Sequence, residues 1–140
     1  MLKTLKKIDI RSNIVYVGVV VVFILFALML SGRGFTSTVN LLNILRQSSI
    51  IIVMAMAMTF VIGAAEIDLS VGSIAGLASV ATAMAIARFG VFPGILAGLL
   101  VGVLCGVING LLVAWAKIPS FLVTLAMMGI TVGVAQWITD

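Results

Sequence analysis

Five glycines recur at every fourth position through an uncharged segment that runs from residue 93 to residue 116. They are Gly94, Gly98, Gly102, Gly106 and Gly110. The segment is long enough to cross a bilayer as a helix, because about 20 apolar residues span the hydrocarbon core. Residues four apart lie along one side of a helix, so the backbone of another helix can come close there. The pattern therefore predicts a helix-packing role for these glycines in a membrane helix bundle.

The composition of the whole chain is typical of a membrane protein. Apolar residues make up 64% of its 140 residues and charged residues 9%, against about 45–50% and about 25% in soluble domains. With no histidine and one cysteine, Cys105, the sequence excludes an internal disulfide and predicts no metal site. The net charge of +4 does not indicate a nucleic-acid partner, because the basic residues form no patch with aromatic side chains.

Five apolar segments predict an all-α, polytopic membrane helix bundle in a single domain that covers residues 1–140. The predicted membrane spans are residues 14–30, 48–65, 70–87, 93–116 and 121–138. Between the first two, residues 35–47 place leucines on one helical face, which favours a short interfacial helix over a solvated loop.

Four basic residues crowd the first eleven positions, immediately before the first apolar segment. They are Lys3, Lys6, Lys7 and Arg11. No small-residue cleavage pattern follows the apolar segment, so it is read as a membrane span and not as a signal peptide. Because basic residues favour the cytoplasmic side of a membrane, we predict a cytoplasmic N-terminus.

Two of the chain's four acidic residues lie between apolar spans, in Glu66-Ile-Asp-Leu-Ser-Val-Gly-Ser73. A carboxylate is costly in hydrocarbon, so both acids are expected to face protein, water or the membrane interface. The Asp68 carboxylate is placed to cap the following helix by accepting a hydrogen bond from the N–H of Ser70 or Val71. The segment therefore predicts a break between two helices, shielded by the bundle or lining a wet cavity.

Broken helices with polar side chains often mark the place where a transporter meets its solute. The residues that could form such a substrate pathway are Glu66, Asp68, Ser70, Ser73 and Asn109. The sequence leaves a plainer alternative open. In it, Asp68 only caps a helix, Glu66 only reaches the interface, and Asn109 only bonds a neighbouring helix. No nucleophile with a base and no phosphate-binding loop is recognisable, so we predict neither an enzyme nor a cofactor.

Residues 66–73 resemble the Gly-Ile-Asp-Leu-Ser-Val-Gly-Ser signature of the membrane permease subunits of ribose- and xylose-type ABC importers. Asn40-Leu-Leu-Asn-Ile-Leu-Arg-Gln47 resembles the family's segment before the second span. Ile118-Pro-Ser-Phe-Leu-Val-Thr-Leu-Ala-Met-Met128 resembles its entry into the fifth. The three stretches share the order and spacing of the family over essentially the whole chain.

This resemblance implies a permease that imports a simple sugar or a similar polyhydroxylated solute across the bacterial cytoplasmic membrane. It implies three partners, which are a second permease subunit, a cytoplasmic ATPase that hydrolyses the ATP, and an extracytoplasmic sugar-binding protein. Glu66 departs from the family pattern, in which glycine is common at this place. Family members also run well beyond this length and carry a cytoplasmic coupling segment, so we expect the N-terminal part of a permease, which alone does not transport.

Two other functions remain open on the sequence. One is a non-transporting helical membrane assembly held together by the glycine groove, and the other is a small homodimeric solute exporter. Gly102→Leu should damage both a permease and an assembly protein, whereas Asp68→Ala should damage only a permease. The exporter is disfavoured by the odd number of predicted spans and by the lack of an acidic residue inside a span for proton coupling.

Overall fold

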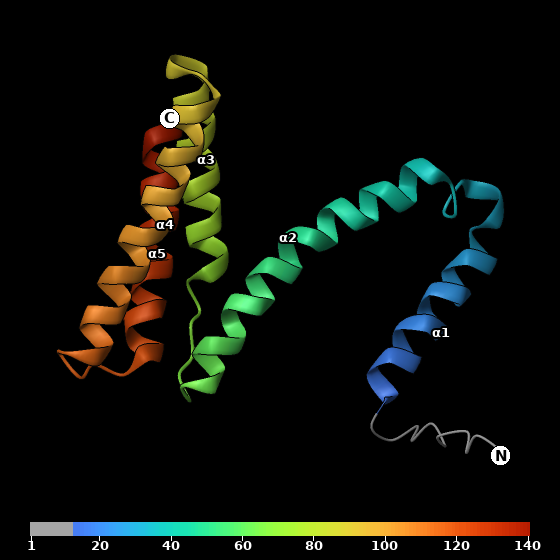
Figure 1. Ribbon diagram of the computed structural model, residues 1–140, viewed down its shortest axis with the longest axis horizontal. Coiled ribbons are helices and arrows are strands. Elements are labelled where there is room, and N and C mark those ends of the chain that lie inside the picture. Colours follow the sequence, from blue (N-terminus) through green and yellow to red (C-terminus); the bar gives the residue numbers. More distant parts are fainter. Residues whose placement is uncertain (1–12) are drawn as a thin grey trace, which may run out of the picture. The chain divides into compact units, whose positions relative to one another are not determined.

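The computed structural model describes residues 13–140, and all the regular secondary structure in that part of the chain is helical. The elements are α1 (Ile14–Met29), η1 (Ser31–Arg33), α2 (Thr38–Gly63), α3 (Val71–Phe89), α4 (Val91–Ala114) and α5 (Ser120–Thr139) (Figure 1). This arrangement confirms the predicted all-α class of polytopic helix bundle. The basic N-terminal cluster, on which the predicted orientation depends, lies outside the described residues.

Four of the described helices, α2 to α5, are long and apolar enough to cross a membrane. Helices α3, α4 and α5 begin and end within a few residues of the spans expected at 70–87, 93–116 and 121–138. Helix α1 is apolar but shorter, with 16 residues. At about 1.5 Å per residue it is shorter than the roughly 30 Å hydrocarbon core, so a crossing by α1 stays a prediction.

The segment expected to form a separate interfacial helix is instead the first part of α2, which runs unbroken for 26 residues. No glycine or proline occurs between Thr38 and Ile62, and the polar residues around Arg46 are compatible with a helix. The Ser37 hydroxyl accepts a hydrogen bond from the backbone N–H of Asn40 at 3.3 Å, which caps the start of the helix.

The chain divides into two compact units, residues 1–52 and residues 53–140. In the first unit the chain turns after α1 through η1 and Gly34, which has a positive φ of 76°. The Phe35 ring then packs against Phe23 and Phe26 of α1, with ring centroids 5.5 and 6.0 Å apart. These aromatic contacts fix the turn against the end of α1, while most side chains of α1 are exposed.

In the second unit α3 contacts both α4 and α5, and the three helices lie side by side (Figure 1). Its interior is unlike that of a soluble protein, because polar side chains are buried while most large apolar ones are exposed. The buried apolar residues are Leu77, Cys105, Val123 and Met127, and the buried polar ones are Ser70, Asn109, Thr124 and Thr131. Such an interior suits helices that face lipid and are joined by hydrogen bonds.

Helices α3 and α4 form a hairpin that turns on the single residue Gly90. Its φ of 94° and ψ of 179° lie in a region that is essentially restricted to glycine. The backbone N–H of Gly90 also bonds the last turn of α3, reaching the carbonyl of Ile86 at 3.0 Å. The tight turn brings the C-terminal end of α3 directly against the start of α4.

The glycines of α4 do not all lie in the same surroundings. A Cβ atom at Gly94 would collide with the Ile86 side chain and lie 3.1 Å from the carbonyl oxygen of Thr82. A Cβ atom at Gly98 would collide with the Thr82 hydroxyl. The three later members of the series, Gly102, Gly106 and Gly110, have nothing within 4 Å of that position. Close backbone packing against α3 is therefore limited to the first two glycines.

Candidate binding pocket

The predicted break between helices occupies the residues between Gly63 and Val71. Two backbone hydrogen bonds close the end of helix α2. The N–H of Glu66 donates to the carbonyl of Val61 at 3.1 Å, and the N–H of Ala65 donates to the carbonyl of Ile62 at 2.9 Å. This pattern is a Schellman motif, in which the residue after the cap is left-handed and is usually glycine. Here that residue is Ala65, with a φ of 59°.

After this turn the chain runs without helical structure along the first turns of α5 (Figure 1). The N–H of Ile67 bonds the hydroxyl of Ser120, the first residue of α5, at 3.1 Å. Farther along, the Ser73 hydroxyl lies 2.8 Å from that of Thr131. Eleven residues of α5 separate these two contacts, which is about 16 Å at helical rise. The break thus lies against the first turn of α5, and the start of α3 continues along α5 as far as Thr131.

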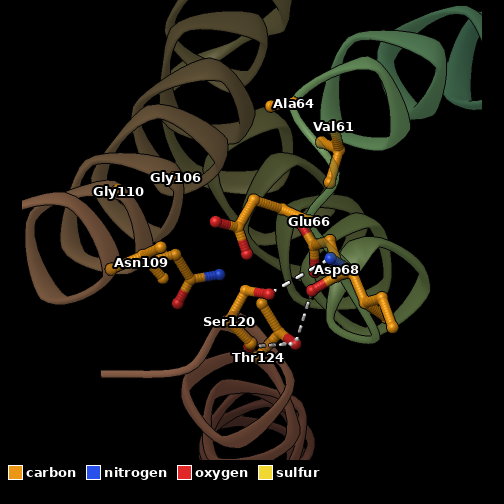
Figure 2. Close-up of a pocket in the computed structure, with 11 residues that line it drawn as sticks. Val61, Ala64, Glu66, Asp68, Gly106, Asn109, Gly110, Ser120 and Thr124 are labelled. Carbon is orange, nitrogen blue, oxygen red and sulfur yellow. Dashed lines mark hydrogen bonds between the residues drawn. The ribbon is translucent and has the colours of Figure 1, made fainter. Parts of the chain in front are cut away.

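Polar side chains of α5 bond the unwound backbone. Besides the bond from the N–H of Ile67 to Ser120, the Thr124 hydroxyl lies 3.3 Å from the carbonyl oxygen of Ile67, although the carbonyl of Ser120, at 2.8 Å, is its nearer acceptor (Figure 2). Irregular backbone at membrane depth needs such partners, because lipid offers none. The sequence analysis contains Ser120 and Thr124 only within the stretch Ile118–Met128 that resembles the family, and it gave them no role at the break. Their spacing of four is visible in the sequence, but nothing there indicates Ile67, more than fifty residues earlier.

The Asp68 carboxylate stabilises the start of α3. One of its oxygens, Oδ1, accepts hydrogen bonds from the backbone N–H of Ser70 at 2.7 Å and from the Ser70 hydroxyl at 2.6 Å. The bond to the Ser70 N–H was among those expected. The N-cap position itself belongs to Ser70, and Asp68 forms an Asx turn two residues before it.

Asn109 of α4 extends this hydrogen-bonded chain. Its amide nitrogen Nδ2 donates to the Ser70 hydroxyl at 3.0 Å. Ser70 is completely buried, and Asn109 is only 7% exposed. The amide oxygen of Asn109 has no hydrogen-bond partner in the described part of the chain. A buried polar atom without a partner is uncommon in proteins and needs an explanation.

A pocket of about 340 Å³ opens beside the break, within the second unit (Figure 2). Its polar lining residues are Glu66, Asp68, Asn109, Ser120 and Thr124. Gly106 and Gly110 also line it, so these two glycines leave space there instead of bringing a helix close. Of the five residues predicted for a substrate pathway, the structure thus brings Glu66, Asp68 and Asn109 to one pocket.

The other two predicted pathway residues, Ser70 and Ser73, do not line this pocket. The Ser70 hydroxyl lies between Asp68 and Asn109, and the Ser73 hydroxyl donates to the carbonyl of Ser70 at 2.9 Å. Both serines therefore support the structure around the pocket. Their part in a pathway stays a prediction.

The Glu66 side chain is half-buried and has no hydrogen-bond or ion-pair partner among residues 13–140. It also lines a second, neighbouring pocket together with Lys117, which lies in the turn between α4 and α5. In the same part of the chain, no three His, Cys, Asp or Glu side chains come close enough to hold a metal ion. The pocket beside the break is therefore lined by several hydrogen-bond acceptors, and the Glu66 carboxylate among them has no partner in the described residues.

A polytopic helix bundle with a polar pocket at an unwound segment is an arrangement found in membrane transport proteins. Residues 40–140 match the family described as branched-chain amino acid transport system / permease component. The chain belongs to this family of membrane permeases. It is therefore a permease component and not itself an enzyme, as the sequence predicts.

Several curated relatives make the resemblance more specific. The chain is 39% identical over 142 residues to the xylose transport system permease protein XylH of Haemophilus influenzae. The alignment covers 96% of this chain and 37% of that protein. It is 37% identical over 107 residues to the ribose import permease protein RbsC of the same organism. That alignment covers 76% of this chain and 33% of RbsC. These matches confirm the resemblance to ribose- and xylose-type permeases.

Another relative is the autoinducer 2 import system permease protein LsrC of Yersinia pseudotuberculosis, 36% identical over 132 residues, with 93% of this chain and 38% of that protein covered. The chain thus spans 33–38% of the length of these three relatives. No solved structure matches it significantly.

Proposed function

We propose that this chain forms part of the solute path of an ATP-binding-cassette importer for a simple sugar or a similar polyhydroxylated solute. The observation that carries the proposal is the identity of 39% to a permease named for xylose and 37% to one named for ribose. The pocket supports it, because carboxylate, amide and hydroxyl groups there can replace the water around a polyol.

The proposal includes three partners, because ABC importers divide their work among subunits. A second permease subunit, identical or different, would complete the path. A cytoplasmic ATPase would hydrolyse the ATP, and an extracytoplasmic binding protein would deliver the sugar. The exposed apolar faces of α3, α4 and α5 leave room for lipid and for such a second subunit.

The proposed location is the bacterial cytoplasmic membrane, with the N-terminus in the cytoplasm. If α1 crosses the membrane, the break at residues 64–70 and the turn at residues 115–119 both lie toward the cytoplasmic side. The bond between Ile67 and Ser120 supports their placement at the same end of the helices. Substituted cysteines at Ile67 and Lys117 should accordingly react with an impermeant thiol reagent from the same side, and one at Arg88 from the other.

A hybrid permease tests the proposed function. This chain replaces the segment of Escherichia coli XylH to which it is 37% identical over 142 residues, in cells without their own XylH. We expect energy-dependent uptake of radiolabelled xylose or ribose, and a loss of about tenfold in the Asp68→Ala hybrid, because two hydrogen bonds to Ser70 disappear.

Native XylH is the positive control of this experiment. Uptake of a branched-chain amino acid in place of a pentose would contradict the assignment of a sugar as the solute. A well-inserted hybrid that takes up no solute, while native XylH does, would favour the non-transporting assembly. Competition by autoinducer 2 would assign the solute of LsrC in place of a pentose.

A further inference from the structure

We propose that the second pocket, the one that Glu66 shares with Lys117, binds the headgroup of a zwitterionic phospholipid with a primary ammonium group. The Glu66 carboxylate accepts hydrogen bonds from this ammonium group, and the Lys117 ammonium pairs with the phosphate. The ligand is thus of the phosphatidylethanolamine class. The proposal goes beyond the proposed function and does not depend on the nature of the solute.

This headgroup pocket lies where the break meets the turn between α4 and α5, and its volume is about 530 Å³. Its polar lining residues are Glu66, Lys117 and Ser120, and its other lining residues are small or apolar. The Glu66 side chain points from the break toward α4, whose Gly110 also lines the pocket (Figure 2). The pocket therefore offers one negative and one positive group within a largely apolar wall.

The two charged groups of the headgroup pocket are not paired with each other. No carboxylate oxygen of Glu66 lies within 4.0 Å of the Lys117 ammonium, and neither group has another ion-pair partner among residues 13–140. A half-buried carboxylate beside apolar helices is costly when it has no partner. A ligand that carries both charges would satisfy the two groups at once.

The position of the pocket favours a lipid over a soluble zwitterion. Trp115, which directly follows α4, is 82% exposed. An exposed tryptophan at the end of a membrane helix is typical of the level of the lipid headgroups. Val107 and Leu111 lie farther into the helix on the side that lines the pocket, and both are exposed. They provide an apolar surface for the acyl chains of a lipid whose headgroup occupies the pocket.

The polar lining selects among phospholipid headgroups. A quaternary ammonium has no N–H to donate and is usually bound by aromatic side chains, which do not line this pocket. An anionic headgroup would leave the Glu66 carboxylate unpaired and would be repelled by it. The Ser120 hydroxyl accepts from the N–H of Ile67 and keeps its own proton for a phosphate oxygen. A primary ammonium together with a phosphate therefore fits all three polar groups.

The backbone at Lys117 gives independent support for a role of its side chain. Its φ of 56° lies in the left-handed region, which favours glycine. A lysine at this position makes the turn less favourable, and strained residues of this kind cluster at ligand-binding sites. Contact with a phosphate accounts for a lysine where the backbone alone would favour glycine.

Competition among phospholipids tests the proposal on the unmodified protein. Native mass spectrometry of the delipidated protein in detergent counts the lipids that bind from equal mixtures. Dioleoyl phosphatidylethanolamine competes with the phosphatidylcholine or the phosphatidylglycerol that has the same acyl chains. We expect the first bound lipid to be phosphatidylethanolamine, by about tenfold over either competitor, the usual effect of one hydrogen bond to a charged group. Lipids that bind later, along the exposed helices, should show no preference.

Two substitutions separate the contributions of the two charges. Glu66→Gln keeps the shape of the side chain and removes its charge, so the preference over phosphatidylglycerol should disappear. Lys117→Gln removes the partner of the phosphate and should weaken binding of the first phosphatidylethanolamine about tenfold. Asp140→Asn and Arg88→Gln are the matched controls, because each removes the same charge at a residue that does not line the pocket. Both controls should bind lipid as the unmodified protein does.

Equal binding of the three phospholipids, or an unchanged preference in both pocket variants, would overturn the proposal. The same holds if the controls lose as much preference as the pocket variants, because the lipid then binds elsewhere on the helices. Displacement of the first lipid by an equal concentration of soluble phosphoethanolamine would assign the pocket to a soluble zwitterion instead. Equal losses of thermal stability in the lipid-free Glu66→Gln and Lys117→Gln variants, without any lipid preference, would indicate a direct ion pair between the two residues.

Discussion

The two ends of the α3–α4 hairpin are held together in different ways, although one glycine repeat runs along the whole of α4. At the turn end, around Gly90, the backbones themselves meet, and Gly94 and Gly98 leave no room for a Cβ atom. At the break end the helices meet through side chains, in the bond between Asn109 and Ser70. The later glycines there have open space or line the pocket. The same spacing thus provides close packing at one end and an open space at the other.

The difference shows that a small-residue repeat permits close approach without requiring it. Whether helices come close depends on what the neighbouring helix presents at that level. Thr82 and Ile86 of α3 fill the space over Gly98 and Gly94. Toward the break end α3 still accompanies α4 as far as Asn109, which bonds the N-cap residue Ser70, but no neighbouring atom lies within 4 Å of a Cβ position at Gly102 or Gly106. A glycine repeat should therefore be interpreted together with the distance of its neighbour at each level.

Replacing a glycine by leucine near each end of the hairpin should give the largest difference in stability between the two ends. Gly98→Leu forces a side chain into the Thr82 hydroxyl and should lower stability by about 1–3 kcal/mol, the usual cost of overpacking. Gly102→Leu, with open space around it, should change stability by less than about 0.5 kcal/mol. Thermal unfolding in detergent measures both. Equal losses at the two positions would mean that the ends do not differ.

Removing a hydrogen bond at the break end should have an intermediate effect. Ser120→Ala deprives the N–H of Ile67 of its partner and should cost about 1–2 kcal/mol, within the range for an unsatisfied backbone group. Ser79→Ala, on the exposed side of α3, is the matched control and should be nearly neutral. Hydrogen exchange should also become faster at Ile67 in the Ser120 variant only. An unchanged exchange rate there would show that α5 does not hold the break.

A pair of glycine substitutions at the end of α2 should give the smallest effect, and with opposite signs. Ala65 has a left-handed φ of 59°, which costs a non-glycine residue about 1–2 kcal/mol. Ala65→Gly should therefore stabilise the protein by about 0.5–1 kcal/mol after the added flexibility of glycine is subtracted. Ala64→Gly, one residue earlier, gains no such relief and should destabilise it by a similar amount. Two losses of equal size would argue against strain at this turn.

The sequence predicted those features that depend on local periodicity and composition. The helical class, a break in the segment 66–73 and the hydrogen bond from the N–H of Ser70 to Asp68 all follow from neighbours within a few positions, although the break lies at residues 64–70 and residues 71–73 are already helical. The contacts of Ser120 and Thr124 with Ile67 were not predictable, because they join segments more than fifty residues apart. The continuity of α2 was missed because its polar residues suggested an interface where the helix has no breaker.

The unbroken length of α2 has a mechanical consequence. Its 26 residues measure about 39 Å at helical rise, roughly 9 Å more than the hydrocarbon thickness of an average bilayer. The excess lies in the first part of the helix, which carries Asn40, Asn43, Arg46 and Gln47, whereas residues 48–63 measure only about 24 Å. An apolar stretch shorter than the hydrocarbon core is accommodated by local thinning of the bilayer or by flanking polar side chains that reach the interface. Because Val61 and Ala64 line the pocket, the pocket lies at the end of this short apolar stretch.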